Sequence, residues 1–255
     1  MSHQPHTRQL DRDAPFRQAP TRSSASGPSH IASTRDVAIY FREDCRDLRD
    51  ALQLEMVVAQ YVLRIRDVRS SAGIAVGEAV GTGVVAELEG FGDPLSHAIL
   101  RGLAHLGRGE IARRSSEAAA RLAERETGML RQFADVGETS PVGTWRMLGE
   151  VEGDEVLFGE FEHRRGRRHT VALFVDPRGG GTVKHLGLLG PTSELDPDEP
   201  LHPSFMEELA IPAGLELIRD ALERTYGPDG AESDDFRVLI ALARANSTAS
   251  DCRAF

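Results

Sequence analysis

The sequence predicts an α+β fold, in which a small antiparallel sheet packs against helices from both flanking segments. Residues 145–189 contain four short apolar runs separated by turn residues, whereas residues 35–126 and 203–246 show the apolar spacing of helices. The links between the four runs are short, and short links favour antiparallel neighbours because a parallel crossover needs a long connection. We therefore expect a four-stranded meander within residues 142–190.

Alternation of apolar and polar residues defines the expected strands. Trp145 and Met147 would lie on one face of the first strand, and Arg146 would lie on the other. Three further strands are expected at 155–163, 169–175 and 182–189. Because alternate turns of a meander lie at the same end of the sheet, the turn near Asp154 and the loop Asp176–Gly181 should share one end.

The segment before the sheet is expected to be helical. Apolar spacing predicts one helix from Asp36 to Arg69 and, later, an αα-hairpin. The hairpin begins at Asp93-Pro94, because aspartate is a favoured N-cap and proline fits the first helical turn. Gly107-Arg108-Gly109 separates its two helices. The glycine-rich stretch 70–92 should be a closely packed or flexible connection between the first helix and the hairpin.

The segment after the sheet begins with a proline-rich linker, Pro191–Pro203. Ser204 and Glu207 fit a capping box for a helix that begins at Phe205, and Pro212 would interrupt that helix. Further helices are expected up to residue 246. Together, these segments should pack on the sheet.

Composition, net charge and cysteine content indicate which classes of protein this chain can belong to. Residues 1–34 are rich in polar residues and proline, so we expect a disordered tail. The formal net charge of -10 argues against a general nucleic-acid binder, whose affinity comes from neutralising phosphates. No apolar run approaches the length of a membrane span, and the two cysteines show no pairing pattern. These features predict a soluble, cytoplasmic protein with no membrane partner.

The strongest candidate for a ligand site lies at the turn between the third and fourth strands. A carboxylate ends one strand, three glycines free the backbone, and a lysine and a histidine begin the next strand. Exposed amides in a glycine loop can bind anions, and the lysine would add charge. The alternative is a hairpin whose glycines only supply unusual φ angles. The candidate residues are Asp176, Gly179, Gly180, Gly181, Lys184 and His185.

Two weaker candidates for a ligand site lie at the turn between the second and third strands. His163 and His169 could face each other, but Glu160 and Glu162 would point to the opposite face from His163, so we expect no metal site and treat the histidines as surface residues. The arginine loop 164–168 could bind phosphate, but no aromatic residue interleaves with it, and a solvated hairpin tip is the alternative.

Catalytic and cofactor motifs are weak in this chain. Gly81-Thr82-Gly83 resembles part of a dinucleotide fingerprint, but Ala86 occupies the third glycine position and no strand precedes the motif. No serine stands in a Gly-x-Ser-x-Gly context, and neither Cys45 nor Cys252 has the setting of a nucleophile. We therefore predict no catalytic residue and no cofactor.

The run from Phe161 to Lys184, preceded by the αα-hairpin, resembles a group of uncharacterised proteins of GC-rich Gram-positive, actinobacterial-type bacteria. In that group a strand ends in Val-Asp, a Gly-Gly turn follows, and a lysine begins the next strand. The resemblance covers residues 93–190, and Pro177 departs from the pattern. It implies no activity. The matching residues are Val175-Asp176, Gly179-Gly180 and Lys184.

Two functional hypotheses follow from the sequence. The leading one is a non-enzymatic accessory or regulatory protein that binds another protein, because the chain offers a helical hairpin and an acidic surface but no catalytic constellation. The alternative is a small-molecule or phosphate-binding protein, or an enzyme, that uses the glycine loop Asp176–His185. Association with a second copy of the chain is compatible with both.

Overall fold

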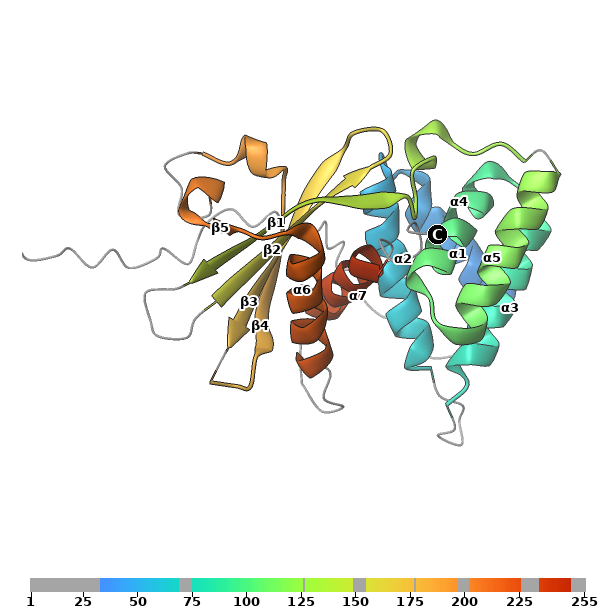
Figure 1. Cartoon of the computed structure of the whole chain (residues 1–255). Coiled ribbons are helices and arrows are strands. Elements are labelled where there is room, and N and C mark those ends of the chain that lie inside the picture. Colours follow the sequence, from blue (N-terminus) through green and yellow to red (C-terminus); the bar gives the residue numbers. More distant parts are fainter. Residues whose placement is uncertain are drawn as a thin grey trace, which may run out of the picture.

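The computed structural model describes seven stretches of the chain, and the fold is α+β as expected. Most of the expected tail, residues 1–32, lies outside these stretches. Figure 1 shows one group of helices on one side of the molecule and the sheet on the other. The described residues are 33–68, 75–125, 127–148, 155–176, 178–196, 202–225 and 234–248.

Five helices form the helical half of the molecule, and their sequences explain where each begins. Ser33 caps the first helix in a capping box, and the side chains of Asp50 and Asp93 cap the second and fourth. None of the helices within the described ranges is long and apolar enough to cross a membrane. The five are α1 (Thr34–Arg46), α2 (Ala51–Arg66), α3 (Gly77–Phe91), α4 (Pro94–Leu106) and α5 (Gly109–Glu124).

The αα-hairpin is present as α4 and α5, but two other expectations for this half are wrong. The single helix expected from Asp36 to Arg69 is two helices, because the Asp50 carboxylate accepts the Gln53 amide at 2.9 Å and so starts a new helix. The expected glycine-rich connection is helical from Gly77, and Gly81 lies against Ile111 of α5. Close packing between helices therefore accounts for that glycine.

The sheet is antiparallel, and its strand order is β4-β3-β2-β1-β5. The expectation of four strands is wrong by one, because the short strand β5 pairs with Trp145 and Arg146 of β1. The helix expected at Phe205 begins instead at Ile211, so that Pro212 lies in its first turn. The strands are β1 (Thr139–Leu148), β2 (Glu155–His163), β3 (Arg168–Asp176), β4 (Thr182–Leu189) and β5 (Glu207–Glu208).

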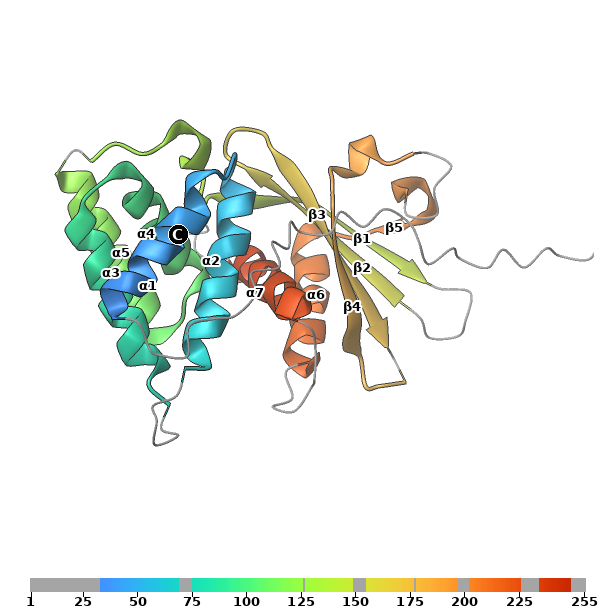
Figure 2. The same ribbon diagram turned by 180° about the vertical axis from the view of Figure 1, so that it is seen from behind.

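The two faces of the sheet have different neighbours. Helix α6 (Ile211–Thr225) packs on one face, and α7 (Asp234–Thr248) lies between that face and α2, as Figure 2 shows from behind. The inner core joins side chains of β2 and β3, such as Phe161 and Leu173, to Ile218 of α6. We call the opposite side of the sheet the outer face. Its apolar residues are Val156, Phe158 and Ala172, with Trp145, Met147, Phe174, Leu189 and Met206 partly buried against them.

Gly214 brings α6 close to the sheet. A Cβ atom at this position would overlap the Thr144 side chain of β1. We expect Gly214→Ala to destabilise the protein by about 2 kcal/mol in urea unfolding, because overpacking outweighs the better helix propensity of alanine. The matched control is Gly90→Ala, since nothing lies within 4 Å of an added Cβ there. Equal stabilisation by both substitutions would contradict this close packing.

Candidate functional site

The structure brings the predicted glycine-loop residues together in the β3–β4 hairpin. The Lys184 Nζ atom lies 2.9 Å from Asp176 Oδ2, and the Arg178 amide donates to Asp176 Oδ1 at 3.0 Å. The hydrogen bond from Lys184 is the main reason that the pKa of Asp176 is lowered. Gly180 and Gly181 have φ angles of 77° and 81°, which favour glycine. The charges of Asp176 and Lys184 therefore compensate each other within the hairpin.

His185 is the one predicted loop residue that stands apart from this pairing. It is exposed on β4, opposite Phe174, and so lies on the outer face. Ligand binding by the loop stays a prediction, and a ligand there would compete with Asp176 for Lys184.

His163 and His169 are not surface residues, and that expectation is wrong. Their side chains are 1% and 2% exposed. They are also not opposite each other, because Phe161 pairs with His169, although the two imidazole centroids lie 5.3 Å apart. Glu160 points to the outer face as expected, where it accepts hydrogen bonds from Thr192. Across the described stretches, no group of three or more His, Cys, Asp or Glu side chains is placed to hold a metal ion.

The two histidines belong to a buried polar cluster where the helical half meets the sheet. Asn246 Nδ2 lies 3.1 Å from His169 Nε2, and the Thr139 hydroxyl donates to Asn246 Oδ1 at 2.9 Å. The Gly137 amide donates to Glu55 Oε1 at 2.9 Å. We define the buried polar cluster as Glu55 of α2, His105 of α4, His163 of β2, His169 of β3 and Asn246 of α7.

Burial shifts every titratable group of this cluster towards its neutral form. It raises the pKa of Glu55 to about 8 and lowers the pKa of His169 to about 3. Burial is also the main cause of the lowered pKa values of His163 and His105. Glu55 Oε2 and His163 Nε2 lie 4.0 Å apart, and neither atom has a hydrogen-bond partner in the structure. At neutral pH the cluster therefore carries little charge.

Apolar spacing in the sequence could have predicted that Glu55 of this cluster is buried. Glu55 follows Ala51 by four residues and precedes Val58 by three, so it falls on the buried stripe of α2. A carboxylate on an apolar stripe indicates a buried partner. Asn246 follows Leu242 by four residues and Ala243 by three, so it falls on the buried stripe of α7 in the same way.

The arginine loop is bound to the helical half of the molecule. Arg167 lies 2.8 Å from Asp50 at the start of α2, and Arg165 lies 3.4 Å from Asp135. Arg164 lies 3.4 Å from Glu138. These arginines therefore have carboxylate partners within the chain, but every residue of the loop is exposed, as expected for a solvated hairpin tip.

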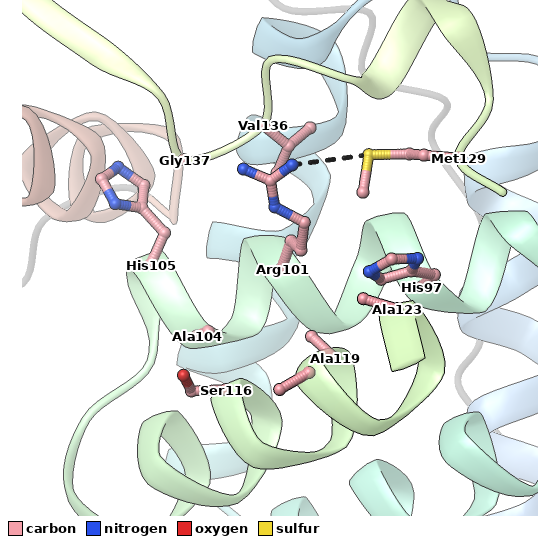
Figure 3. A pocket seen from close by; sticks show the side chains of 11 residues that line it. His97, Arg101, Ala104, His105, Ser116, Ala119, Ala123, Met129, Val136 and Gly137 are labelled. Atoms are coloured by element: carbon pink, nitrogen blue, oxygen red, sulfur yellow. Dashed lines mark hydrogen bonds between the residues drawn. The ribbon is translucent and has the colours of Figure 1, made fainter. Parts of the chain in front are cut away.

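A cavity of about 530 Å³ opens beside α4 and α5 (Figure 3). The guanidinium group of Arg101 lines this cavity and already has hydrogen-bond partners within the chain. It donates to Glu138 at 2.6 Å and to the carbonyl of Ala134 at 3.2 Å. His105 and Gly137 form the end of the cavity, and Gly137 is the residue that bonds Glu55. This cavity thus borders the buried polar cluster, but its main charge is neutralised.

The two edge strands of the sheet differ in length and in charge. Strand β4 has eight residues and, within the described residues, pairs only with β3. At the opposite edge, the two exposed glutamates of β5 pair with Trp145 and Arg146, two of the ten residues of β1. A short, charged strand blunts an edge, whereas a long strand presents a row of unpaired backbone groups. We call the side of β4 away from β3 the open edge.

Comparisons with known protein families, with curated protein sequences and with solved structures found no match.

Proposed function

We propose that this chain is a non-enzymatic accessory protein that binds another polypeptide through the open edge of β4. The observation that carries the proposal is the contrast between the two edges of the sheet. Strand β4 offers eight residues of backbone, while β5 offers two exposed glutamates. A partner segment that adds as a strand gains main-chain hydrogen bonds to the edge strand.

The apolar residues of the outer face limit which partner segment could add to β4. Side chains of an added strand alternate between the two faces of the sheet. On the outer face they would extend an apolar surface, because Phe174 and Leu189 at this side of the sheet are only partly buried. The partner should therefore present an extended segment with apolar residues at every second position.

The ends of the open edge limit where the added strand can pair. At the start of β4 the Val183 amide donates to the Thr225 hydroxyl of α6 at 2.7 Å, so this amide is already used. Lys184 and His185 follow and are exposed. Pairing is therefore expected along residues 184–189.

Two proline variants separate binding from folding. In an antiparallel strand, the backbone groups of successive residues point to opposite sides. Of His185→Pro and Leu186→Pro, one removes a hydrogen bond to β3 and destabilises the protein. The other removes only an outward N–H group. We expect the variant that keeps wild-type stability to lose the stoichiometric partner that copurifies with the tagged protein from its own host.

The control for this experiment is Lys184→Gln, which removes a charge next to the same edge but keeps every backbone N–H. It should retain the partner. If the stable proline variant also retains the partner in full, β4 is not the binding site.

A further inference from the structure

The cavity of about 530 Å³ is lined by both helices of the αα-hairpin and by the segment 129–137. Helix α4 contributes His97, Arg101 and His105, whose spacing of four residues places them on one face of the helix. Figure 3 shows these three side chains in a row along α4. Helix α5 contributes Ser116 and three alanines. The volume is that of a pocket for a small molecule.

The lining of this cavity favours a neutral, largely apolar ligand. Arg101 is the one arginine, lysine or carboxylate residue that lines it, and its guanidinium group is paired with Glu138 at 2.6 Å. A charged ligand would therefore have to compete with an ion pair within the chain. Most of the other lining residues are apolar, namely Ala104, Ala119, Ala120, Ala123, Met129 and Val136.

His97 adds a hydrogen-bond acceptor to this apolar surface. Its side chain is almost wholly buried, with the residue 7% exposed. Among the described residues its one hydrogen-bond partner is the carbonyl of Thr127, 3.2 Å from Nδ1. Because a carbonyl only accepts, Nδ1 carries the hydrogen, and Nε2 of the neutral ring is an acceptor. This Nε2 atom has no partner and is not sealed within the protein, unlike Nε2 of His105, so a ligand in the cavity can reach it.

We propose that this cavity binds a small neutral molecule with an apolar body and a hydroxyl group, of the size of a simple phenol. The hydroxyl group donates to Nε2 of His97, and the apolar body lies against the alanines of α5. Met129 closes on the body from the other side, because an unbranched thioether side chain adapts to irregular shapes. Binding then adds a donor to a buried imidazole and removes apolar surface from water.

An NMR titration of the full chain at neutral pH with phenol, anisole and benzoate tests the proposal. We expect phenol to shift the amide signals of α4 and α5 in a saturable way. Anisole has the same ring but no donor, so it should bind about tenfold more weakly through the loss of one hydrogen bond. Benzoate also lacks a donor and should bind no better than anisole. Tighter binding of benzoate than of phenol would indicate an anion site and overturn the proposal.

Ala120→Leu fills the cavity and should prevent phenol binding. Ala120 is exposed, so a leucine there occupies the cavity without overpacking the core. The matched control is Ala79→Leu, because Ala79 is exposed on α3 and lies outside the lining. This control should bind phenol like the wild type. The thermal midpoint of each free variant checks that it is folded.

His97→Phe separates the hydrogen bond from the shape of the cavity. Phenylalanine keeps an aromatic ring but removes the acceptor, so this variant should bind phenol and anisole equally. If its thermal midpoint shows that it does not fold, the comparison of phenol with anisole in the wild type still tests the acceptor.

Three results would overturn the proposal: no saturable shift with phenol, equal affinities of the wild type for phenol and anisole, or unchanged phenol binding by Ala120→Leu. The lining of the cavity shares no residue with β4, so this experiment and the test of the open edge are independent.

Discussion

Glu55→Gln is expected to make the protein more stable than the wild type above neutral pH. The Glu55 carboxyl group is wholly buried on α2, and burial raises its pKa to about 8. In the unfolded chain it ionises near the ordinary value of 4.5. The folded state therefore holds a proton that the unfolded state has lost between these two values. Wild-type stability should fall as pH rises through this window and level off above it.

The magnitude follows from the linkage of one proton. Between pH 6.5 and 8 the wild type should lose about 2 kcal/mol of unfolding free energy through this group. Burial lowers the pKa values of His163 and His169, so their contribution rises with pH only up to the ordinary histidine value of 6.5 and is constant above it. The chosen window therefore isolates Glu55.

Urea unfolding at several pH values between 6.5 and 8.5 measures this difference. Glutamine resembles the neutral acid and keeps an acceptor for the Gly137 amide. Glu43→Gln is the matched control, because Glu43 is exposed on α1 and its side chain is 50% accessible. The control should keep the pH slope of the wild type. Parallel slopes for Glu55→Gln and the wild type would show that Glu55 is not buried as a neutral acid.

Asn246→Leu is expected to destabilise the protein by about 2–5 kcal/mol, because it leaves several buried polar groups without partners. Asn246 is 0% exposed. It accepts from the Thr139 hydroxyl and bonds the ring of His169. Leucine has a similar size but can serve neither group, so each desolvated group loses its hydrogen bond while staying buried.

A double-mutant cycle with Thr139→Val separates this effect from repacking. Valine removes the hydroxyl that Asn246 accepts, so in the Asn246→Leu background there is no longer a bond to lose. We expect the second substitution to be less costly there than in the wild type by about 1 kcal/mol. Strict additivity of the two substitutions would mean that the Thr139–Asn246 bond contributes nothing to stability.

The parts of the fold that the sequence predicts correctly depend on local signals. Asp93-Pro94 starts α4 through a cap and a preset φ angle, and glycines at 107 and 109 separate it from α5. The strands β2 to β4 follow from apolar runs bounded by turn residues. Each of these signals acts within a few residues, so it is visible without tertiary contacts.

The missed features depend on contacts between distant segments. Strand β5 has two glutamates and no strand propensity of its own, and it exists because β1 pairs with it. His163 at the end of β2 and His169 near the start of β3 are polar, yet they are buried where Glu55 of α2 and Asn246 of α7 lie beside them. The bond between Gly137 and Glu55 spans 82 residues of sequence. Periodicity within one element does not predict such contacts.

For the candidate loop, too, the sequence predicts the local turn but not the contacts between its side chains. Its glycines and charged residues were correctly placed together, but only the structure shows that Lys184 and Asp176 bind each other. The predicted meander places its fourth strand at an edge of the sheet, but only the structure shows that β5 adds to the opposite edge. Protein binding therefore stays the leading hypothesis, and the binding site proposed for it is strand β4.

Hydrogen exchange of the β4 amides tests the central claim most directly. The tagged protein would be purified gently from its own host, its partner identified by native mass spectrometry, and exchange compared between the complex and the free chain. We predict that the complex slows exchange of alternate amides within residues 184–189 by at least about tenfold. Protection confined to other elements, with β4 exchanging as in the free chain, would contradict strand addition at the open edge.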